Sequence, residues 1–258
     1  MLGLIAFLTG LIVGSFLNVC IYRLPKEESV VWPASRCLSC QKPIAGYDNI
    51  PVVSFIFLRG RCRQCGVKIS WQYPAVEFLT AALFVLFYRV FGLSWEGALY
   101  LFFSLGLLVQ SFIDFRHQII PDEITLPGIL VGFVASGFFP GLHGETFWAR
   151  GLLQSLIGIL AGGGSLYLVG TVAERILKKE AMGGGDVKLL AMIGAFLGWK
   201  AVFWTIFVSS LLGAGAGIYL RFKKGEERIP FGPYLAIAAF LYLFFGPRAI
   251  KCYQNFFG

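Results

Sequence analysis

Long apolar runs alternate with short connections rich in polar residues, glycine and proline along most of the chain. A helix needs roughly 20 predominantly apolar residues to cross a bilayer. Eight runs approach or reach that length, at about residues 1–22, 74–91, 95–113, 124–140, 151–173, 186–199, 200–220 and 230–247. The pattern therefore predicts an all-α polytopic membrane protein with about eight transmembrane helices.

One stretch does not fit the membrane pattern. Residues 23–73 are polar, basic and rich in turn-forming residues, and they make the only connection long enough for a small internal domain. We therefore expect a first transmembrane helix at 1–22, a cytoplasmic domain at 23–73 and a membrane domain at 74–258. The glycines at 162–164 lie inside an apolar run, where small residues allow helices to pack closely.

Composition supports the membrane assignment. Of the 258 residues 57% are hydrophobic and only 14% are charged, whereas about a quarter of a soluble domain is charged. The first apolar run has no lysine or arginine before it, and Arg23 and Lys26 follow it. This order favours a retained helix with its N-terminus outside over a cleaved signal peptide.

The distribution of basic residues sets the expected topology. With the N-terminus outside and eight spans, 17 of the 22 lysine and arginine residues fall on the inner side, as the positive-inside tendency requires. The net charge of +8 thus reports orientation and affinity for anionic lipid headgroups. It gives no reason to expect nucleic-acid binding. We expect a multi-pass membrane protein with its basic loops in the cytoplasm.

Four of the six cysteines form two pairs, Cys37 with Cys40 and Cys62 with Cys65, with 21 residues between the pairs. This spacing is typical of a four-thiolate zinc site, one residue longer than the usual interval. Gly66 follows the second pair, where the backbone must curl to point its amides at the thiolates. All four ligand positions are filled, so the zinc would be structural. Two disulfides are the alternative, which a reducing cytoplasm disfavours.

Two aspartates stand at the ends of apolar runs, Asp114 in SFIDFRHQIIP and Asp186 in MGGGDVKLL. A carboxylate there is costly unless it is paired or used. The expected topology puts both at the cytoplasmic boundary, and two nearby carboxylates share a proton because they cannot both ionise cheaply. Such a pair can activate water for attack on a carbonyl carbon and protonate the leaving amine. Gly183 and Gly185 would leave room for an extended substrate.

Simpler roles are open for the acidic residues. Asp186 could cap a helix, and Asp114 could be an interfacial acid balanced by Arg116. Asp122 and Glu123 follow Pro121 at the start of an apolar run, and capping is the favoured interpretation there.

Several motifs together resemble those of the bacterial type IV prepilin peptidases, also called prepilin leader peptidase/N-methyltransferases. These are GSFLNVCIYRLP at 14–25, the four-cysteine loop, ISWQYPAVEFLT at 69–80, DFRHQIIPDEITLP with Asp114, MGGGDVKLL with Asp186, and IPFGPYLAIA at 229–238. A glycine–aspartate motif alone is shared with other membrane aspartic proteases. The combination covers nearly the whole chain and is specific.

The resemblance implies an aspartic endopeptidase with Asp114 and Asp186 as its catalytic pair. It would remove the basic leader of type IV prepilins and type II secretion pseudopilins, cutting between Gly and Phe at the cytoplasmic face of the inner membrane. Relatives of this length also methylate the new N-terminus with S-adenosylmethionine. The chain has no dinucleotide-type glycine fingerprint, so the contacts with the methyl donor cannot be derived.

Glu77 and Asn18 are candidates for those contacts because each is a polar group within an apolar segment. Their simpler roles are an acid in the first helical turn and an interhelical hydrogen bond. Three alternatives remain: a peptidase without methyl transfer, a non-enzymatic scaffold whose zinc loop docks a partner, and an ion-coupled transporter. The transporter would show polar residues at mid-bilayer depth and an inverted repeat, and neither is visible.

Overall fold

The computed structural model describes residues 1–178, 183–224 and 230–257. Over these ranges the chain is helical, apart from loops, turns and two isolated antiparallel bridges. It divides into two compact units, Met1–Leu105 and Gly106–Gly258, and the boundary falls inside a helix. The all-α fold class that the apolar pattern predicts is confirmed.

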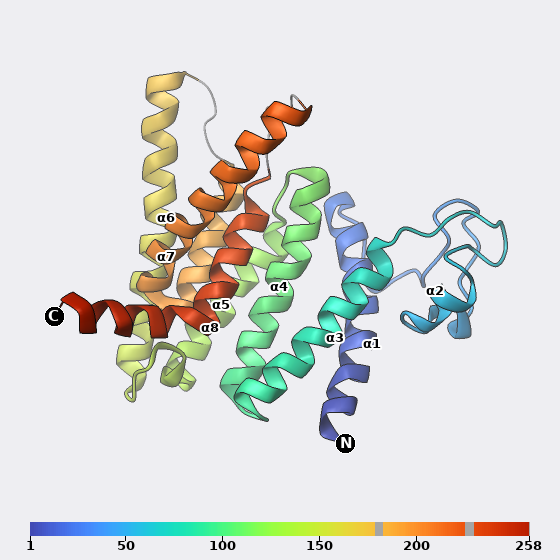
Figure 1. Ribbon diagram of the computed structural model, residues 1–258, viewed down its shortest axis with the longest axis horizontal. Helices are drawn as coiled ribbons and strands as arrows, with labels where there is room; N and C mark the ends of the chain where they lie inside the picture. Colours follow the sequence, from blue (N-terminus) through green and yellow to red (C-terminus); the bar gives the residue numbers. More distant parts are fainter. Residues whose placement is uncertain (179–182, 225–229, 258) are drawn as a thin grey trace. The chain divides into compact units, whose positions relative to one another are not determined.

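The first unit is built on a close pair of helices, α1 (Leu2–Arg23) and α3 (Gln72–Phe91), which lie side by side in Figure 1. Glycine makes this closeness possible. A Cβ at Gly14 of α1 would lie only 2.6 Å from the Cα of Glu77 on α3, so any side chain there would push the helices apart. The pair therefore brings the predicted candidate Glu77 directly against α1.

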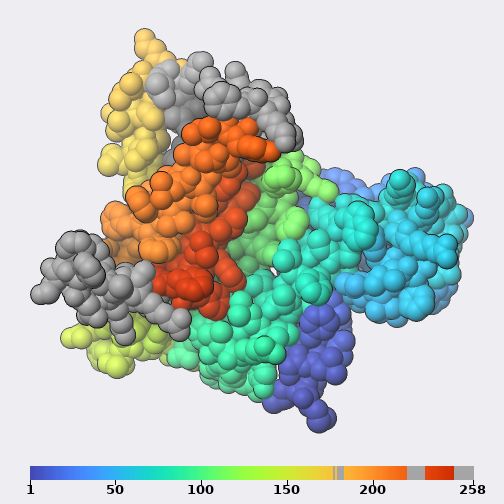
Figure 2. All heavy atoms as spheres, viewed as in Figure 1, coloured from blue at the N-terminus to red at the C-terminus, as the bar shows by residue number. Residues whose placement is uncertain are grey.

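The residues that connect the end of α1 to the start of α3, 24–71, form the cysteine-containing loop. The loop contains only short helices, namely η1 (Leu24–Lys26), η2 (Gly46–Asn49) and α2 (Val53–Phe57). In Figure 2 its atoms, in light blue and cyan, form a lobe beside the start of α3. The loop is thus the one substantial non-membrane part of the first unit, where the sequence places its zinc domain.

Helix α4 (Trp95–His117) begins in the first unit and continues into the second. The second unit then contains α5 (Asp122–Phe138), η3 (Pro140–His143), α6 (Trp148–Leu177), α7 (Gly184–Lys224) and α8 (Gly232–Phe257).

Helices α6 and α7 run side by side (Figure 1), and their backbones touch. A Cβ on Gly158 of α6 would collide with the backbone of Gly194 of α7, and one on Gly162 would collide with the carbonyl of Leu190. Small residues allow such an approach where larger ones would not. The predicted packing role of the glycines at 162–164 is confirmed for Gly162, whereas a Cβ on Gly164 would meet nothing within 4 Å.

A kink divides α7 into two parts. Gly198 has φ 78° and ψ 174° inside an otherwise helical segment, a conformation that strongly favours glycine. Residues 189–198, before and at the kink, are all buried, whereas exposed positions recur after it. The two parts correspond to the apolar runs predicted at 186–199 and 200–220.

A half-buried histidine closes the turn between α5 and α6. His143 Nε2 lies 2.8 Å from the hydroxyl of Ser136 on α5, and its Nδ1 is buried against Gly198 of α7. Burial lowers the pKa of His143 to about 4, although Glu145 acts in the opposite direction. The turn is therefore built around a neutral imidazole.

Five helices in the described ranges are long and apolar enough to cross a membrane: Leu2–Lys26, Gln72–Phe91, Trp95–His117, Trp148–Ile176 and Gly184–Tyr219. A shorter apolar helix covers Gly232–Gly246, and α5 has 17 residues. The chain is a multi-pass membrane protein. The predicted number of eight spans is not confirmed, because two apolar runs merge into α7 and others give helices too short by this criterion.

Candidate active site and metal centre

Asp114 lies one turn from the end of α4 and is 5% exposed. Its Oδ2 accepts a hydrogen bond of 2.8 Å from the backbone N–H of Gly232, the first residue of α8. The first N–H groups of a helix have no partner within the helix and carry a partial positive charge. The start of α8 therefore supplies a built-in donor for this carboxylate.

Asp186 lies in the first turn of α7 and is half-buried. It is close enough to Asp114 for the two carboxylates to repel each other electrostatically. The structure thus brings together, within the second unit, two residues that are 72 positions apart in the sequence.

The two glycines predicted to support Asp186 differ in importance. A Cβ on Gly185 would lie 2.8 Å from the Cβ of Ile120, whereas one on Gly183 would make only an ordinary contact of 3.4 Å with Asp186 Oδ2. Gly185 is therefore needed for the segment before α5 to pack against the start of α7. Gly183 contributes a backbone carbonyl, which accepts the N–H of Asp186 at 3.1 Å.

The capping role expected for Asp122 and Glu123 is wrong. The N-cap of α5 is Pro121, no side chain caps this helix, and both acids lie in its first turn. Both carboxylate oxygens of Asp122 instead lie 2.7 Å from Nζ of Lys188, two residues after Asp186. The ion pair ties the start of α5 to the first turn of α7, a long-range partner that local sequence did not reveal.

The two cysteine pairs form matching knuckles. In the first, the N–H of Cys37 donates to Lys42 and the N–H of Gln41 donates back to Cys37. In the second, Cys62 donates to Val67 and Gly66 donates back to Cys62. In the second knuckle, Gly66 turns the chain with φ 70°, as the sequence predicts. The equivalent residue of the first knuckle, Gln41, has φ 56° without being glycine.

The four sulfur atoms converge on one point. Those of Cys37, Cys40, Cys62 and Cys65 all lie within 4.8 Å of one another, and each thiol is free. Four thiolates at this separation fit a tetrahedral zinc ion with bonds of roughly 2.3 Å. The predicted ligand set is therefore assembled, and the two-disulfide alternative does not match the structure.

The thiols differ in their tendency to ionise. Backbone N–H groups, that of Cys40 foremost, lower the pKa of Cys37 to about 7. For Cys65 the N–H of Val67 also acts to lower the pKa, but burial and hydrogen bonds with the neighbouring thiols raise it to about 11. Cys37 therefore ionises more readily than Cys65, and the thiolate is the form that binds a metal cation.

The two candidates for the methyl-donor site lie in the α1–α3 pair. Asn18 is 3% exposed, and its Nδ2 donates to the carbonyl of Tyr73 at 3.0 Å, which is the interhelical bond foreseen for it; its Oδ1 is buried without a partner. Glu77 is 7% exposed and accepts the N–H of Val52 at 2.7 Å.

Two residues that contact these carboxylates were missed by sequence analysis, Gly232 and Val52. The first stands in FGPY, where a glycine before proline at a helix start could have signalled a close approach. For Val52, no local signal marks a contact with a carboxylate 25 residues away.

Two carboxylates at the ends of apolar helices, in a chain that crosses the membrane several times, define the class as a multi-pass helical membrane protein with acidic residues at its helix ends. Within this class, the chain belongs to the type IV leader peptidase family, whose sequence profile matches residues 101–218 and whose members include relatives 38% identical over nearly the whole chain. The profile of the bacterial peptidase A24 N-terminal domain matches residues 8–91. These matches confirm the resemblance inferred from the motifs, and they make the chain a member of an enzyme family.

Three relatives illustrate the similarity, each named prepilin leader peptidase/N-methyltransferase. The protein from Pseudomonas aeruginosa is 38% identical over 99% of this chain and 94% of its own length. The protein from Xanthomonas campestris is 38% identical over 96% of this chain and 93% of its own length. The protein from Neisseria gonorrhoeae is 37% identical over 92% of this chain and 88% of its own length. No solved structure matches the chain.

Proposed function

We propose that this protein is an aspartic endopeptidase that removes the basic leader of type IV prepilins and pseudopilins and then N-methylates the new terminal residue. The observation that carries the peptidase part is the approach of Asp114 and Asp186, with the N–H of Gly232 on Asp114. The names of the relatives support the substrate and the second activity.

The geometry suggests different roles for the two aspartates. A hydrogen-bond donor stabilises the ionised form of a carboxyl group, so Asp114, which accepts the N–H of Gly232, is the better candidate for the base. It would take a proton from water as the oxygen attacks the scissile carbonyl carbon. Asp186 would hold the shared proton and give it to the amine as the carbon–nitrogen bond breaks.

The four thiolates fit a structural zinc ion, which would hold together a loop that has few apolar residues of its own. S-adenosylmethionine would supply an electrophilic methyl group for the amine. The residue that supports a polar ligand near the loop is Asn18, whose buried Oδ1 has no partner, whereas the carboxylate of Glu77 already accepts the N–H of Val52. We propose that Asn18 contacts the methyl donor and that Glu77 acts on this site indirectly, through the loop.

We place the protein in the bacterial inner membrane with its N-terminus outside. The cysteine loop and the two aspartates would then face the cytoplasm, where 17 of the 22 basic residues fall. A basic leader stays on this side while the apolar pilin helix lies in the bilayer. This orientation presents the leader junction to the carboxylate pair.

The decisive experiment compares the wild type, Asp114→Asn and Asp186→Asn, purified in detergent, on a prepilin with a basic leader and a Gly–Phe junction. Product mass is followed with and without S-adenosylmethionine. We expect wild-type cleavage, an added methyl mass with the donor, and loss of cleavage in both folded variants. Normal cleavage by either variant would remove that aspartate from the mechanism.

A further inference from the structure

A buried carboxylate connects the cysteine loop to the membrane helices of the first unit. Glu77 is 7% exposed within the close α1–α3 pair. Its Oε2 accepts the N–H of Val52 in the loop at 2.7 Å. The proposed cleavage step uses neither oxygen. Burying a carboxylate costs free energy unless hydrogen-bond partners compensate for the lost water. The contact with the loop is therefore part of what stabilises Glu77 in this position.

The loop residue at this contact has an unusual conformation. Val52 has φ 60° and ψ −46° and stands at the N-cap of α2. Positive φ is rare for a β-branched residue and persists only where the surroundings impose it. Here the Glu77 carboxylate is the acceptor for the N–H of Val52, the residue that immediately precedes the first residue of α2. The contact therefore holds the residue before α2 against α3.

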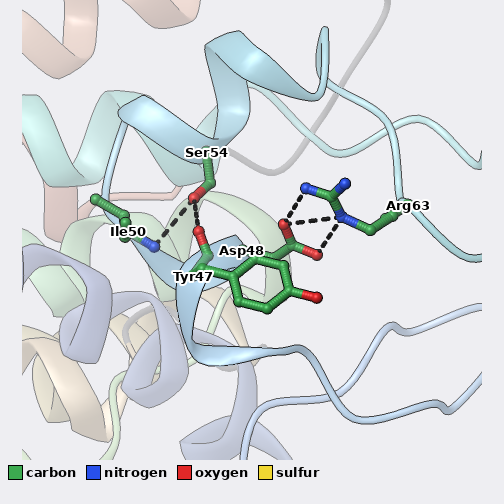
Figure 3. A network of polar contacts seen from close by, with 5 residues as sticks. All are labelled: Tyr47, Asp48, Ile50, Ser54 and Arg63. Atoms are coloured by element: carbon green, nitrogen blue, oxygen red, sulfur yellow. Dashed lines mark hydrogen bonds and ion pairs between the residues drawn. The ribbon is translucent and has the colours of Figure 1, made fainter.

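Further polar contacts lead from α2 to the metal centre. Ser54 of α2 donates to the carbonyl of Tyr47 at 2.9 Å and accepts the N–H of Ile50 at 3.1 Å (Figure 3). The next residue, Asp48, binds Arg63 through contacts of 2.7, 2.8 and 3.1 Å. Arg63 lies between Cys62 and Cys65. Side-chain and backbone contacts thus run from the second cysteine knuckle to Glu77.

We propose that Glu77 is a positioning residue for methyl transfer, which fixes the cysteine loop on the α1–α3 pair through Val52. The inference rests on the methyltransferase part of the proposed function. All of the contacts belong to the first unit, whereas Asp114 and Asp186 belong to the second. Because the proposed methyl-donor contact, Asn18, also lies in the first unit, loss of the Glu77–Val52 bond should affect methylation much more than cleavage.

The test uses the full-length, zinc-loaded protein in detergent with two substitutions. Glu77→Leu removes the acceptor, whereas Glu77→Gln keeps an acceptor oxygen at nearly the same shape. Glu28→Gln, at an exposed acid of the same loop, is the control. Hydrogen exchange at the amides of Val52 and α2, cleavage and methylation are measured separately.

We expect Glu77→Leu to exchange its Val52 amide at least tenfold faster and to methylate at least tenfold more slowly, with cleavage within twofold. Glu77→Gln and Glu28→Gln should resemble the wild type. If Glu77→Gln loses methylation with its loop amides still protected, the carboxylate acts by its charge and the positioning role is wrong.

Two measurements on the wild type complete the test. Fast exchange of the Val52 amide in the wild type itself would overturn it without any variant, even if Glu77→Leu failed to fold. A wild type that cleaves but never methylates would refute the methyltransferase proposal. Hydrogen exchange would then still report whether Glu77 holds the loop.

Discussion

Substitution of Gly232 by alanine tests how Asp114 is held. A Cβ at this position would lie 2.7 Å from Asp114 Oδ2 and 3.2 Å from its Cγ, well inside normal contact distances. Because both residues are buried, either the carboxylate must rotate away or the start of α8 must move. Each movement breaks the hydrogen bond of 2.8 Å from the Gly232 N–H.

A hydrogen bond to a charged group contributes about 1.5–3 kcal/mol. If that stabilisation is available only in the correct geometry, kcat for leader cleavage should fall roughly ten- to hundredfold. The matched control is Gly164→Ala, because a Cβ on that α6 glycine would meet nothing within 4 Å. Prepilin cleavage followed by mass spectrometry, together with a thermal melt, separates a catalytic defect from unfolding. Cleavage by Gly232→Ala within twofold of the control, at an unchanged melting temperature, would refute the role assigned to this contact.

Other predictions concern the knuckles, the histidine and the ion pair. Both Gly66 and Gln41 have positive φ, which costs a residue with a side chain about 1 kcal/mol. Gly66→Ala should therefore speed zinc release to a chelator, and Gln41→Gly should slow it, each through a change of about 1 kcal/mol in the activation free energy of release. Rate changes of the same sign in the two variants would contradict this. Because the folded state lowers the pKa of His143 from 6.5 to about 4, the melting temperature should fall as the pH drops through this range, and His143→Gln should flatten that dependence. Asp122→Asn should slow cleavage no more than about fivefold, since its ion pair with Lys188 is exposed; complete loss would give Asp122 a direct role.

The sequence predicts those parts of the site that depend on spacing or on position along a helix. The two Cys-x-x-Cys pairs specify a four-thiolate cluster because the knuckle is a local structure. Asp114 and Asp186 could be placed at one boundary because each ends or begins an apolar run. Their approach to each other, by contrast, had to be assumed from matched depth.

Contacts between distant backbone and side-chain atoms could not be predicted in this way. The N–H of Gly232 reaches Asp114 across 118 residues, and that of Val52 reaches Glu77 across 25. In both cases the donor is a backbone N–H group, which every residue except proline carries. The residue type therefore gives no sign of the contact. The pairing of Asp122 with Lys188 was missed for a related reason: an acid in a first helical turn already has an adequate local role.

The burial of the first part of α7 has a consequence for how the enzyme tolerates different membranes. Outward-facing side chains of the outer helices, such as Leu153 and Leu160 of α6, meet the lipid and adjust first when the bilayer becomes thicker or thinner. Residues 189–198 are enclosed by protein, so the segment that carries Asp186 has little contact with lipid there. Changes in lipid chain length should therefore be absorbed by the outer helices, and one arrangement of the carboxylates can serve bilayers of different thickness.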